Sequence, residues 1–266
     1  MKTVILAGGF GTRISEESHT IPKPMIQIGG RPILWHIMKI YSHYGFNDFI
    51  ILLGYKSYKI VEYFTNYMLH NSDVTLDFRN AADTPEVSIA FHKKVCEPWT
   101  ISLIHTGLNT QTGSRLLKAR EYIGNERFML TYGDGVGDVN ISELVAFHQA
   151  HQRSATVTAV QPLGRFGALT LGDRGTVKSF QEKPAGDRGL ISAGFFVLEP
   201  NVFDYIDPLT DQCTFEANPL ENLALGGQLM AFRHTGYWHP LDTMRDKQRL
   251  EQDWSHPDCP WRLWSN

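Results

Sequence analysis

The chain has few cysteines, and their spacing excludes the common roles of that residue. Its three cysteines, Cys96, Cys213 and Cys259, are far apart and include no CxxC pair. Neither a disulfide framework nor a zinc cluster is therefore predicted. Small apolar side chains buried in the core are the simpler interpretation of all three.

Long apolar runs and a strong charge imbalance are also missing. The apolar run that ends at Leu6 is too short for a signal-peptide core or a membrane span, and no later stretch is long enough. A net charge of −3 gives no global field that would attract nucleic acid or acidic lipid. We therefore expect a soluble, cytoplasmic protein that binds neither nucleic acid nor a membrane.

What is present is an ordinary globular composition with alternating strand and helix patterns. The 266 residues are 42% hydrophobic and 20% charged, which argues against disorder. Short apolar runs bounded by glycine predict buried strands over 3–6 and 49–53, and helical spacing of apolar residues predicts helices over 32–44 and 58–69. Strand, helix, strand and helix in this order indicate right-handed βαβ units and a parallel sheet.

The same patterns continue along the chain. Further strands are expected over 102–104, 128–132, 156–159, 168–171, 177–180, 193–197 and 229–232, and further helices over 114–122, 141–151 and 243–254. Residues 71–99 are polar and turn-rich, so we expect an excursion from the sheet there. We find no repeat or linker and therefore predict one domain over 1–266, with a C-terminal helix and tail over 243–266.

Three glycines, Gly8, Gly9 and Gly11, directly follow the first strand. Glycine lets the backbone turn sharply and bring its N–H groups close to phosphate oxygens. Arg13 and Lys23 can add side-chain charge to such a site. The alternative is a tight strand-to-helix turn selected only for its geometry.

Two well-known phosphate motifs can be tested against this loop, and neither fits well. The P-loop requires Gly-Lys-Ser/Thr at its end, where this chain has Gly11-Thr12-Arg13. The dinucleotide fingerprint requires a third small residue at the position of Ile14.

The sequence LAGGFGTR followed by IPKPM resembles the sugar-phosphate nucleotidyltransferase family, the nucleotide-sugar pyrophosphorylases. The resemblance implies a Rossmann-like α/β fold with a mixed, mostly parallel sheet and helices on both faces. It also implies that the loop wraps the base and triphosphate of a nucleotide. Arg13 would steady the departing pyrophosphate and Lys23 would contact the α-phosphate, so these two are the expected catalytic residues. The expected nucleotide-binding loop comprises Leu6, Ala7, Gly8, Gly9, Phe10, Gly11, Thr12 and Arg13.

Two aspartates stand out as candidate metal ligands. Asp134 follows an apolar strand, where an Asp-Gly turn is the alternative, and Asp242 precedes a predicted helix, where a helix cap is the alternative. Negative charge develops on phosphate oxygens during nucleotidyl transfer. A Mg²⁺ ion held by one or two carboxylates neutralises that charge. The family resemblance implies that Asp134, in its YGD motif, and Asp242, in its W-x-P-x-D-T motif, hold Mg²⁺.

The sugar side of the site is also implied by the resemblance. The segment FQEKP matches the family's sugar-binding segment, in which Glu182 would accept from sugar hydroxyls and Lys183 would meet the sugar phosphate. Tyr132 is expected to bind the sugar phosphate, and Gly194 would leave room for the hexose. Glu182 and Lys183 as an ordinary surface pair is the alternative.

Several segments indicate a particular branch of the family. Ser15-Glu16-Glu17 follows the loop in place of Arg-Leu-x-Pro, and segments such as TYGDGV, SFQEKP and HPLDTMRDK resemble the branch that uses CTP and glucose 1-phosphate. The branch implies transfer of CMP to give CDP-glucose for deoxysugar and O-antigen lipopolysaccharide synthesis. Thr110, Arg115 and Gly133 would then help to bind the nucleotide. The enzymes of this branch are oligomers, often hexamers, so a homo-oligomer is expected.

Three alternatives remain at the level of sequence. The same reaction with dTTP or UTP is the nearest. A non-catalytic nucleotide-sensing relative is another, although such proteins typically lose the charged residues that are all present here. A nicotinamide-binding oxidoreductase is the third, and its poor fingerprint and missing ribose-binding acid argue against it.

Overall fold

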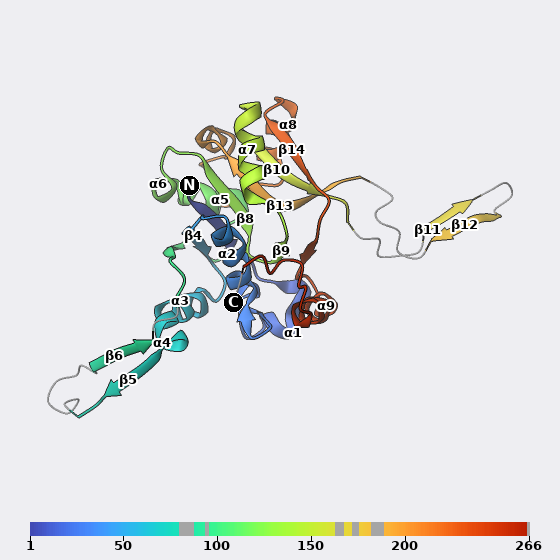
Figure 1. The fold of residues 1–266 in the computed structure, drawn as a ribbon. Helices are drawn as coiled ribbons and strands as arrows, with labels where there is room; N and C mark the ends of the chain where they lie inside the picture. The colour runs from blue at the N-terminus through green and yellow to red at the C-terminus, as the bar shows by residue number, and fades with distance from the viewer. Residues whose placement is uncertain (80–87, 94–95, 163–167, 172–175, 182–188, 265–266) are drawn as a thin grey trace.

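The main sheet forms the centre of the protein (Figure 1). The computed structural model describes residues 1–79, 88–93, 96–162, 168–171, 176–181 and 189–264. Within these residues, seven strands form one sheet in the order β14-β10-β13-β8-β1-β4-β7. In chain order they are β1 Thr3–Ala7, β4 Asp48–Leu53, β7 Thr100–His105, β8 Phe128–Tyr132, β10 Ala155–Val160, β13 Ile191–Leu198 and β14 Leu229–His234.

One strand of this sheet runs against the others. β1 pairs in parallel with both β4 and β8, β4 with β7, and β10 with β14. β13 is antiparallel to both of its neighbours, β8 and β10. The sheet is therefore mixed and mostly parallel, and the carboxyl ends of its parallel strands lie at one edge.

Helices cover both faces of this sheet because its strands are apolar on both sides. In β1, Ile5 and Ala7 belong to one buried cluster while Val4 and Leu6 belong to the other. The first cluster is covered by α2 Ile33–His43, α7 Ile141–His151 and α9 Met244–Ser255. The second is covered by α5 Thr112–Lys118, α6 Arg120–Ile123, η4 Pro200–Tyr205 and α8 Asn218–Leu225. The predicted fold class is confirmed.

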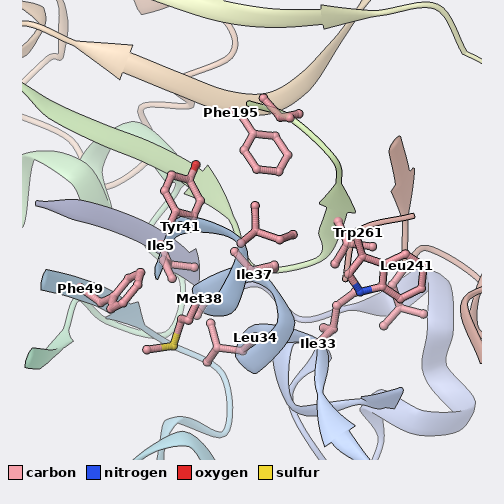
Figure 2. Packing of buried hydrophobic residues seen from close by; sticks show 14 of the residues in the cluster. Ile5, Ile33, Leu34, Ile37, Met38, Tyr41, Phe49, Phe195, Leu241 and Trp261 are labelled. Atoms are coloured by element: carbon pink, nitrogen blue, oxygen red, sulfur yellow. The ribbon is translucent and has the colours of Figure 1, made fainter. Parts of the chain in front are cut away.

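Large apolar side chains fill the first cluster (Figure 2). Ile5 and Phe49 from the sheet meet Ile37 and Tyr41 of α2, and the ring of Tyr41 stacks on that of Phe195 with centroids 5.9 Å apart. The C-terminal tail continues this core, because its Trp261, Leu263 and Trp264 pack against the same cluster. The tail thus packs α9, which follows Asp242, against this core through the contact of Trp261 with Trp254.

Short elements connect the larger ones. They are η1 Thr12–Ile14, α1 Ser15–Ser18, η2 Lys23–Met25, β2 Gln27–Ile28, β3 Arg31–Pro32, α3 Ser57–Thr65, α4 Tyr67–Asn71, β9 Gly135–Gly137 and β15 Trp238–Pro240. β9 pairs with β15, and β2 with β3. In the part of the chain that the structure describes, no helix is long and apolar enough to cross a membrane.

Two hairpins extend from the body of the protein (Figure 1). β5 Asp73–Asp77 and β6 Ser88–Lys93 form one of them, within the stretch that we expected to leave the sheet. β11 Ala168–Leu171 and β12 Val177–Gln181 form the other, as the Gly172–Gly175 turn signal predicts, although residues 172–175 lie outside the described part.

Two predicted helices are each divided in the structure. The helix expected over 58–69 breaks at Asn66, where Asn66 Nδ2 donates to the carbonyl of Glu62 and Thr65 Oγ1 to that of Val61. Such side chains compete with the helical backbone for its acceptors. The helix expected over 114–122 is divided at Ala119, whose N–H bonds three residues back, to Leu116. Spacing of apolar residues alone does not detect such breaks.

Candidate active site

The glycine-rich loop begins where β1 ends, beside the end of β8. The N–H of Gly133, just past β8, donates to the carbonyl of Leu6 at 3.0 Å. Gly11 has a φ of 66°, in the left-handed region that favours glycine, and its carbonyl accepts from Ser18 Oγ at 2.9 Å. The loop therefore turns away from the sheet at Gly11 and is held by the short helix α1 that follows.

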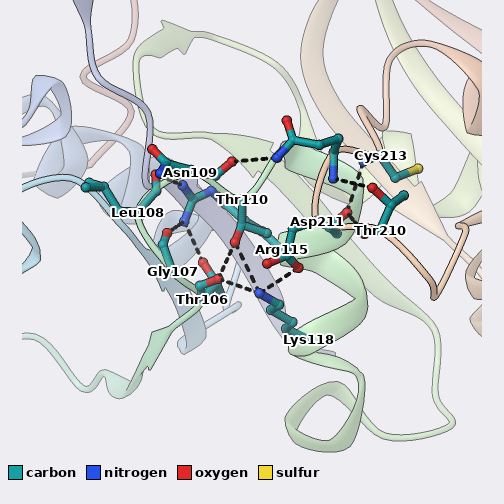
Figure 3. A network of polar contacts seen from close by, with 12 residues as sticks. Thr106, Gly107, Leu108, Asn109, Thr110, Arg115, Lys118, Thr210, Asp211 and Cys213 are labelled. Atoms are coloured by element: carbon teal, nitrogen blue, oxygen red, sulfur yellow. Dashed lines mark hydrogen bonds and ion pairs between the residues drawn. The ribbon is translucent and has the colours of Figure 1, made fainter.

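A buried arginine, Arg115, contacts both this loop and the segment that follows β7, and Figure 3 shows its bonds to the latter. Arg115, only 4% exposed, donates from Nη1 to the carbonyls of Leu53 and Gly107 at 3.0 and 2.7 Å. Its Nη2 donates to the carbonyls of Gly8 and Leu108 at 3.2 and 3.0 Å. A Cβ atom on Gly8 would lie 2.4 Å from the guanidinium, so glycine is required there for this approach. Burial lowers the pKa of Arg115.

Arg115 thus connects three segments: the glycine loop, the end of β4 and the 106–108 loop. A fifth acceptor, the hydroxyl oxygen Thr106 Oγ1, lies 2.7 Å from Nη1. The family resemblance assigned Arg115 to nucleotide binding, and in the structure the residue lines a cavity beside the glycine loop while its guanidinium bonds to backbone oxygens. Thr110 lines the same cavity, and its hydroxyl donates to the carbonyl of Thr106 at 2.7 Å.

Four charged side chains meet at the other end of the loop. Lys23 Nζ lies 2.5 Å from Asp134 Oδ2 and 2.7 Å from Asp242 Oδ1. Arg13 Nη1 lies 2.8 Å from the other oxygen of Asp242. The side chain of Lys23 is 10% exposed, whereas that of Arg13 is 72% exposed. The structure therefore brings together all four residues that the sequence assigned to catalysis and metal binding.

The two aspartates come from distant parts of the chain and are joined by backbone contacts. The N–H of Leu241 donates to the carbonyl of Asp134 at 2.7 Å, next to the paired strands β9 and β15. Thr243, not Asp242, is the N-cap of α9, in a capping box with Asp246. Asp246 Oδ2 also accepts from the N–H of Asp242 at 3.1 Å. The Asp242 carboxylate is thus free of a capping role and faces the basic residues.

The donor set of the two aspartates fits a magnesium ion. Mg²⁺ is usually held by one or two carboxylates, with phosphate oxygens and water completing its shell. Within the described residues, no group of three or more His, Cys, Asp or Glu side chains gathers to hold a metal. One oxygen of Asp134 and one of Asp242 approach the same cation, which here is the ammonium of Lys23. Two carboxylates arranged in this way suit a Mg²⁺ ion that takes its other ligands from phosphate and water.

A cavity of about 270 Å³ lies between the glycine loop and the residues that follow β7 and β8. Every predicted member of the loop lines it, together with Lys23, Thr110, Arg115, Tyr132, Gly133 and Asp134. The residues that sequence reasoning missed are Pro24, Leu108, Asn109, Gln111 and Thr112. Their position on both sides of Thr110 and next to Lys23 was the available signal.

The predicted sugar side is described only in part. Glu182 and Lys183 lie outside the described residues. A Cβ atom on Gly194, whose φ is 78°, would lie 2.2 Å from the ring of Tyr132, so its missing side chain makes room for that ring. Burial and the nearby carboxylate of Glu216 raise the pKa of Tyr132, so its hydroxyl stays protonated.

The fold and the cavity indicate a transferase: the glycine loop, Arg13, Lys23 and Asp134 line one space, and Asp242 contacts both basic side chains. The sequence model of one family, nucleotidyl transferase, matches residues 2–246. The chain belongs to this family and is a nucleotidyltransferase enzyme.

Similar proteins agree with this assignment. The chain is 54% identical over 265 residues to a glucose-1-phosphate cytidylyltransferase of Salmonella typhi, covering 99% of this chain and 100% of that protein. It is 46% identical to a probable glucose-1-phosphate cytidylyltransferase of Bacillus subtilis, covering 99% and 100%. The crystal structure of HddC from Yersinia pseudotuberculosis shares the fold, with a TM-score of 0.66, 24% identity and coverage of 96% and 99%.

Proposed function

We propose that this enzyme transfers CMP from CTP to glucose 1-phosphate and releases CDP-glucose and pyrophosphate. The observation that carries the proposal is the meeting of Lys23, Arg13, Asp134 and Asp242 at the end of a glycine loop. The nucleotide and the sugar follow from relatives that share 54% and 46% identity over nearly the whole chain and bear that activity in their names.

The reaction is an in-line displacement at the α-phosphorus of CTP. An oxygen of the glucose 1-phosphate dianion forms the new P–O bond, and the bond to pyrophosphate breaks. The attacking phosphate is already an anion, so no general base is needed. The chain supplies alignment in the cavity and positive charge from Lys23 at the α-phosphate and Arg13 at the departing pyrophosphate.

Asp134 and Asp242 would hold Mg²⁺, which neutralises charge on the triphosphate when it is bound. In the structure Lys23 bridges these two carboxylates. Its ammonium therefore holds the pair together and keeps a positive charge at the point where the α-phosphate is expected.

On the sugar side we propose that Tyr132, Glu182, Lys183 and Gly194 receive glucose 1-phosphate. Support comes from Tyr132, which lines the cavity next to Gly133 and Asp134 and packs against Gly194. The sugar phosphate would then lie beside Tyr132 and the carboxylate of Asp134.

A comparison of CTP, dTTP, UTP and ATP with glucose 1-phosphate tests the proposal. Pyrophosphate release and the sugar nucleotide formed are measured for each. CTP is expected to give the highest kcat/KM, and equal or better use of dTTP or UTP would overturn the choice of nucleotide. Failure of all four would instead favour the non-catalytic alternative.

We also infer a homo-oligomer in the cytoplasm, whose product enters deoxysugar and O-antigen synthesis. Support for oligomerisation comes from the β5–β6 hairpin, which extends from the body and exposes Leu76, Phe78 and Ile89 at 45, 60 and 43% (Figure 1). A two-stranded hairpin is marginally stable by itself, so we infer that a second copy of the chain packs against these exposed apolar side chains. Light scattering should give a hexamer or a smaller oligomer, and Phe78→Glu should reduce the mass.

A further inference from the structure

A segment outside the site described above holds two of its walls together. Residues 210–216, between η4 and α8, lie along the start of α5 (Figure 3). The N–H groups of Gly113 and Ser114 donate to the carbonyl of Cys213, and Ser114 Oγ donates to that of Thr210. Lys118 Nζ, on the same helix, lies 2.8 Å from Asp211 Oδ1. The segment is therefore fixed to the helix that follows the 108–112 wall of the cavity.

This segment ends in a carboxylate with two partners. Thr112 Oγ1 donates to Glu216 Oε2, and the Tyr132 hydroxyl donates to Glu216 Oε1, each at 2.5 Å. Thr112 belongs to the wall of the cavity formed by 108–112, and Tyr132 belongs to the wall at the end of β8, beside Gly133 and Asp134. Both oxygens of one carboxylate thus connect the two walls.

Packing determines where this carboxylate lies. The ring of Phe215, which is fully buried, meets that of Phe196 with centroids 6.0 Å apart, and Phe196 in turn meets Tyr132 at 6.2 Å. The N–H of Phe215 donates to Thr112 Oγ1 at 2.9 Å. The buried Phe215 therefore fixes the backbone next to Glu216, whose side chain is exposed and whose carboxylate accepts from both hydroxyls.

The hydrogen bond from Tyr132 to Glu216 restricts the tyrosine more than packing alone does. Gly194 lets the ring approach closely. A charge-assisted hydrogen bond from the Tyr132 hydroxyl to the Glu216 carboxylate adds a second restraint at the far end of the ring. The same carboxylate fixes Thr112 at the first turn of α5, so a shift of one wall is passed on to the other.

We propose that Glu216 is a positioning residue that sets the separation of the two walls, so that the nucleotide and the sugar phosphate are bound cooperatively. The proposal rests on the function proposed above, which places the nucleotide against 108–112 and the sugar phosphate against Tyr132. Glu216 touches no reacting atom, so its effect is on the binding of both substrates and little on the chemical step.

Steady-state kinetics of Glu216→Ala and Glu216→Gln test this proposal. We expect Glu216→Ala to raise the KM of CTP and of glucose 1-phosphate about tenfold each and to change kcat less than about threefold. In Glu216→Gln the amide oxygen can accept from one hydroxyl and the amide N–H₂ can donate to the other, so most of the loss should be restored. Glu221→Ala, at an exposed glutamate in the first turn of α8, is the matched control and should behave as the wild type.

Two further measurements separate this role from a structural one. Thermal unfolding of each variant shows whether stability alone has changed. In the cycle of Glu216→Ala with Tyr132→Phe, the two effects on KM should be less than additive, because both variants lose the same bond. Unchanged KM values, a change for one substrate only, or a lower melting temperature with normal KM values would each overturn the proposal.

Failure of the proposed function can be distinguished from failure of the positioning role of Glu216. If the wild type forms no CDP-glucose, the proposed function fails. The positioning role is then tested with whichever nucleoside triphosphate binds the wild type in calorimetry, whose affinity Glu216→Ala should weaken. If the wild type is active and the Glu216 variants bind normally, only the positioning role fails.

Discussion

The ammonium of Lys23 lies 2.5 Å from a carboxylate oxygen of Asp134, although 111 residues separate the two in the chain. The lysine side chain is nearly buried, whereas the aspartate is about one-third exposed. Both residues line the cavity, and the lysine is the more tightly packed of the two.

Replacement of Lys23 by methionine should lower kcat and expose the need for a cation between the two aspartates. We expect kcat to fall about a hundredfold or more, because a charge directed at the α-phosphate is lost. Without its ammonium, Asp134 and Asp242 repel each other. MgCl₂ should therefore raise the melting temperature of Lys23→Met more than that of the wild type, measured without nucleotide. An equal shift in both proteins would argue against a metal site at this pair, and Asp134→Asn is the control.

Arg13 should matter for turnover and little for stability. Its side chain is largely exposed, and ion pairs of that kind contribute about 1 kcal/mol or less. Arg13→Ala should cut kcat by about two powers of ten if the guanidinium stabilises the departing pyrophosphate. Kinetics and urea unfolding of the same preparation check both parts. Near-normal turnover in the folded variant would remove this role.

Arg115, in contrast to Arg13, should contribute strongly to stability. Arg115→Met leaves five oxygens without their buried donor, and we expect a loss of about 2–4 kcal/mol in the free energy of unfolding. Arg115→Lys should recover only part of it, since an ammonium has three donors and no planar fork. Urea unfolding measures both. A lysine variant as stable as the wild type would contradict the fork geometry as the cause.

Acid should destabilise the protein through His36. Burial lowers the pKa of His36 to about 4, against its carbonyl partner Ile28, which favours the protonated form. The folded state therefore keeps His36 neutral while the unfolded state binds a proton below about pH 6.5. Stability should decline as the pH falls from about 6.5 to 4, by up to roughly 3 kcal/mol for this residue.

The variant His36→Phe isolates that contribution. Its free energy of unfolding should depend less on pH between 6.5 and 4 than that of the wild type, by about one proton. Other groups, including His148, titrate in the same range, so the difference between the two proteins is the quantity to compare. Parallel pH profiles would show that His36 is not the source.

The sequence predicts those parts of the fold in which a local pattern is enough. The apolar run Phe128–Tyr132 and the periodic segment Ile141–His151 coincide with β8 and α7, because their residues are buried at the expected spacing. The break at Asn66 was not predictable from that spacing, since it depends on how one amide bonds to its own backbone.

The candidate site shows the same division. Residues of the glycine loop are consecutive, so their association is visible in the sequence. That Asp242 meets Lys23 follows from the pairing of β9 with β15 and was available only through the family resemblance. Glu216 carried no signal, because its partners Tyr132 and Thr112 lie 84 and 104 residues away.

The guanidinium of Arg115 also orients a backbone carbonyl group of the glycine loop. It draws the carbonyl of Gly8 downward, and in a trans peptide the N–H of Gly9 then points the opposite way. A buried cation thus collects the negative ends of four peptide dipoles beside the cavity that its own residue lines. An anion that enters this cavity therefore meets a guanidinium whose position these carbonyls already fix.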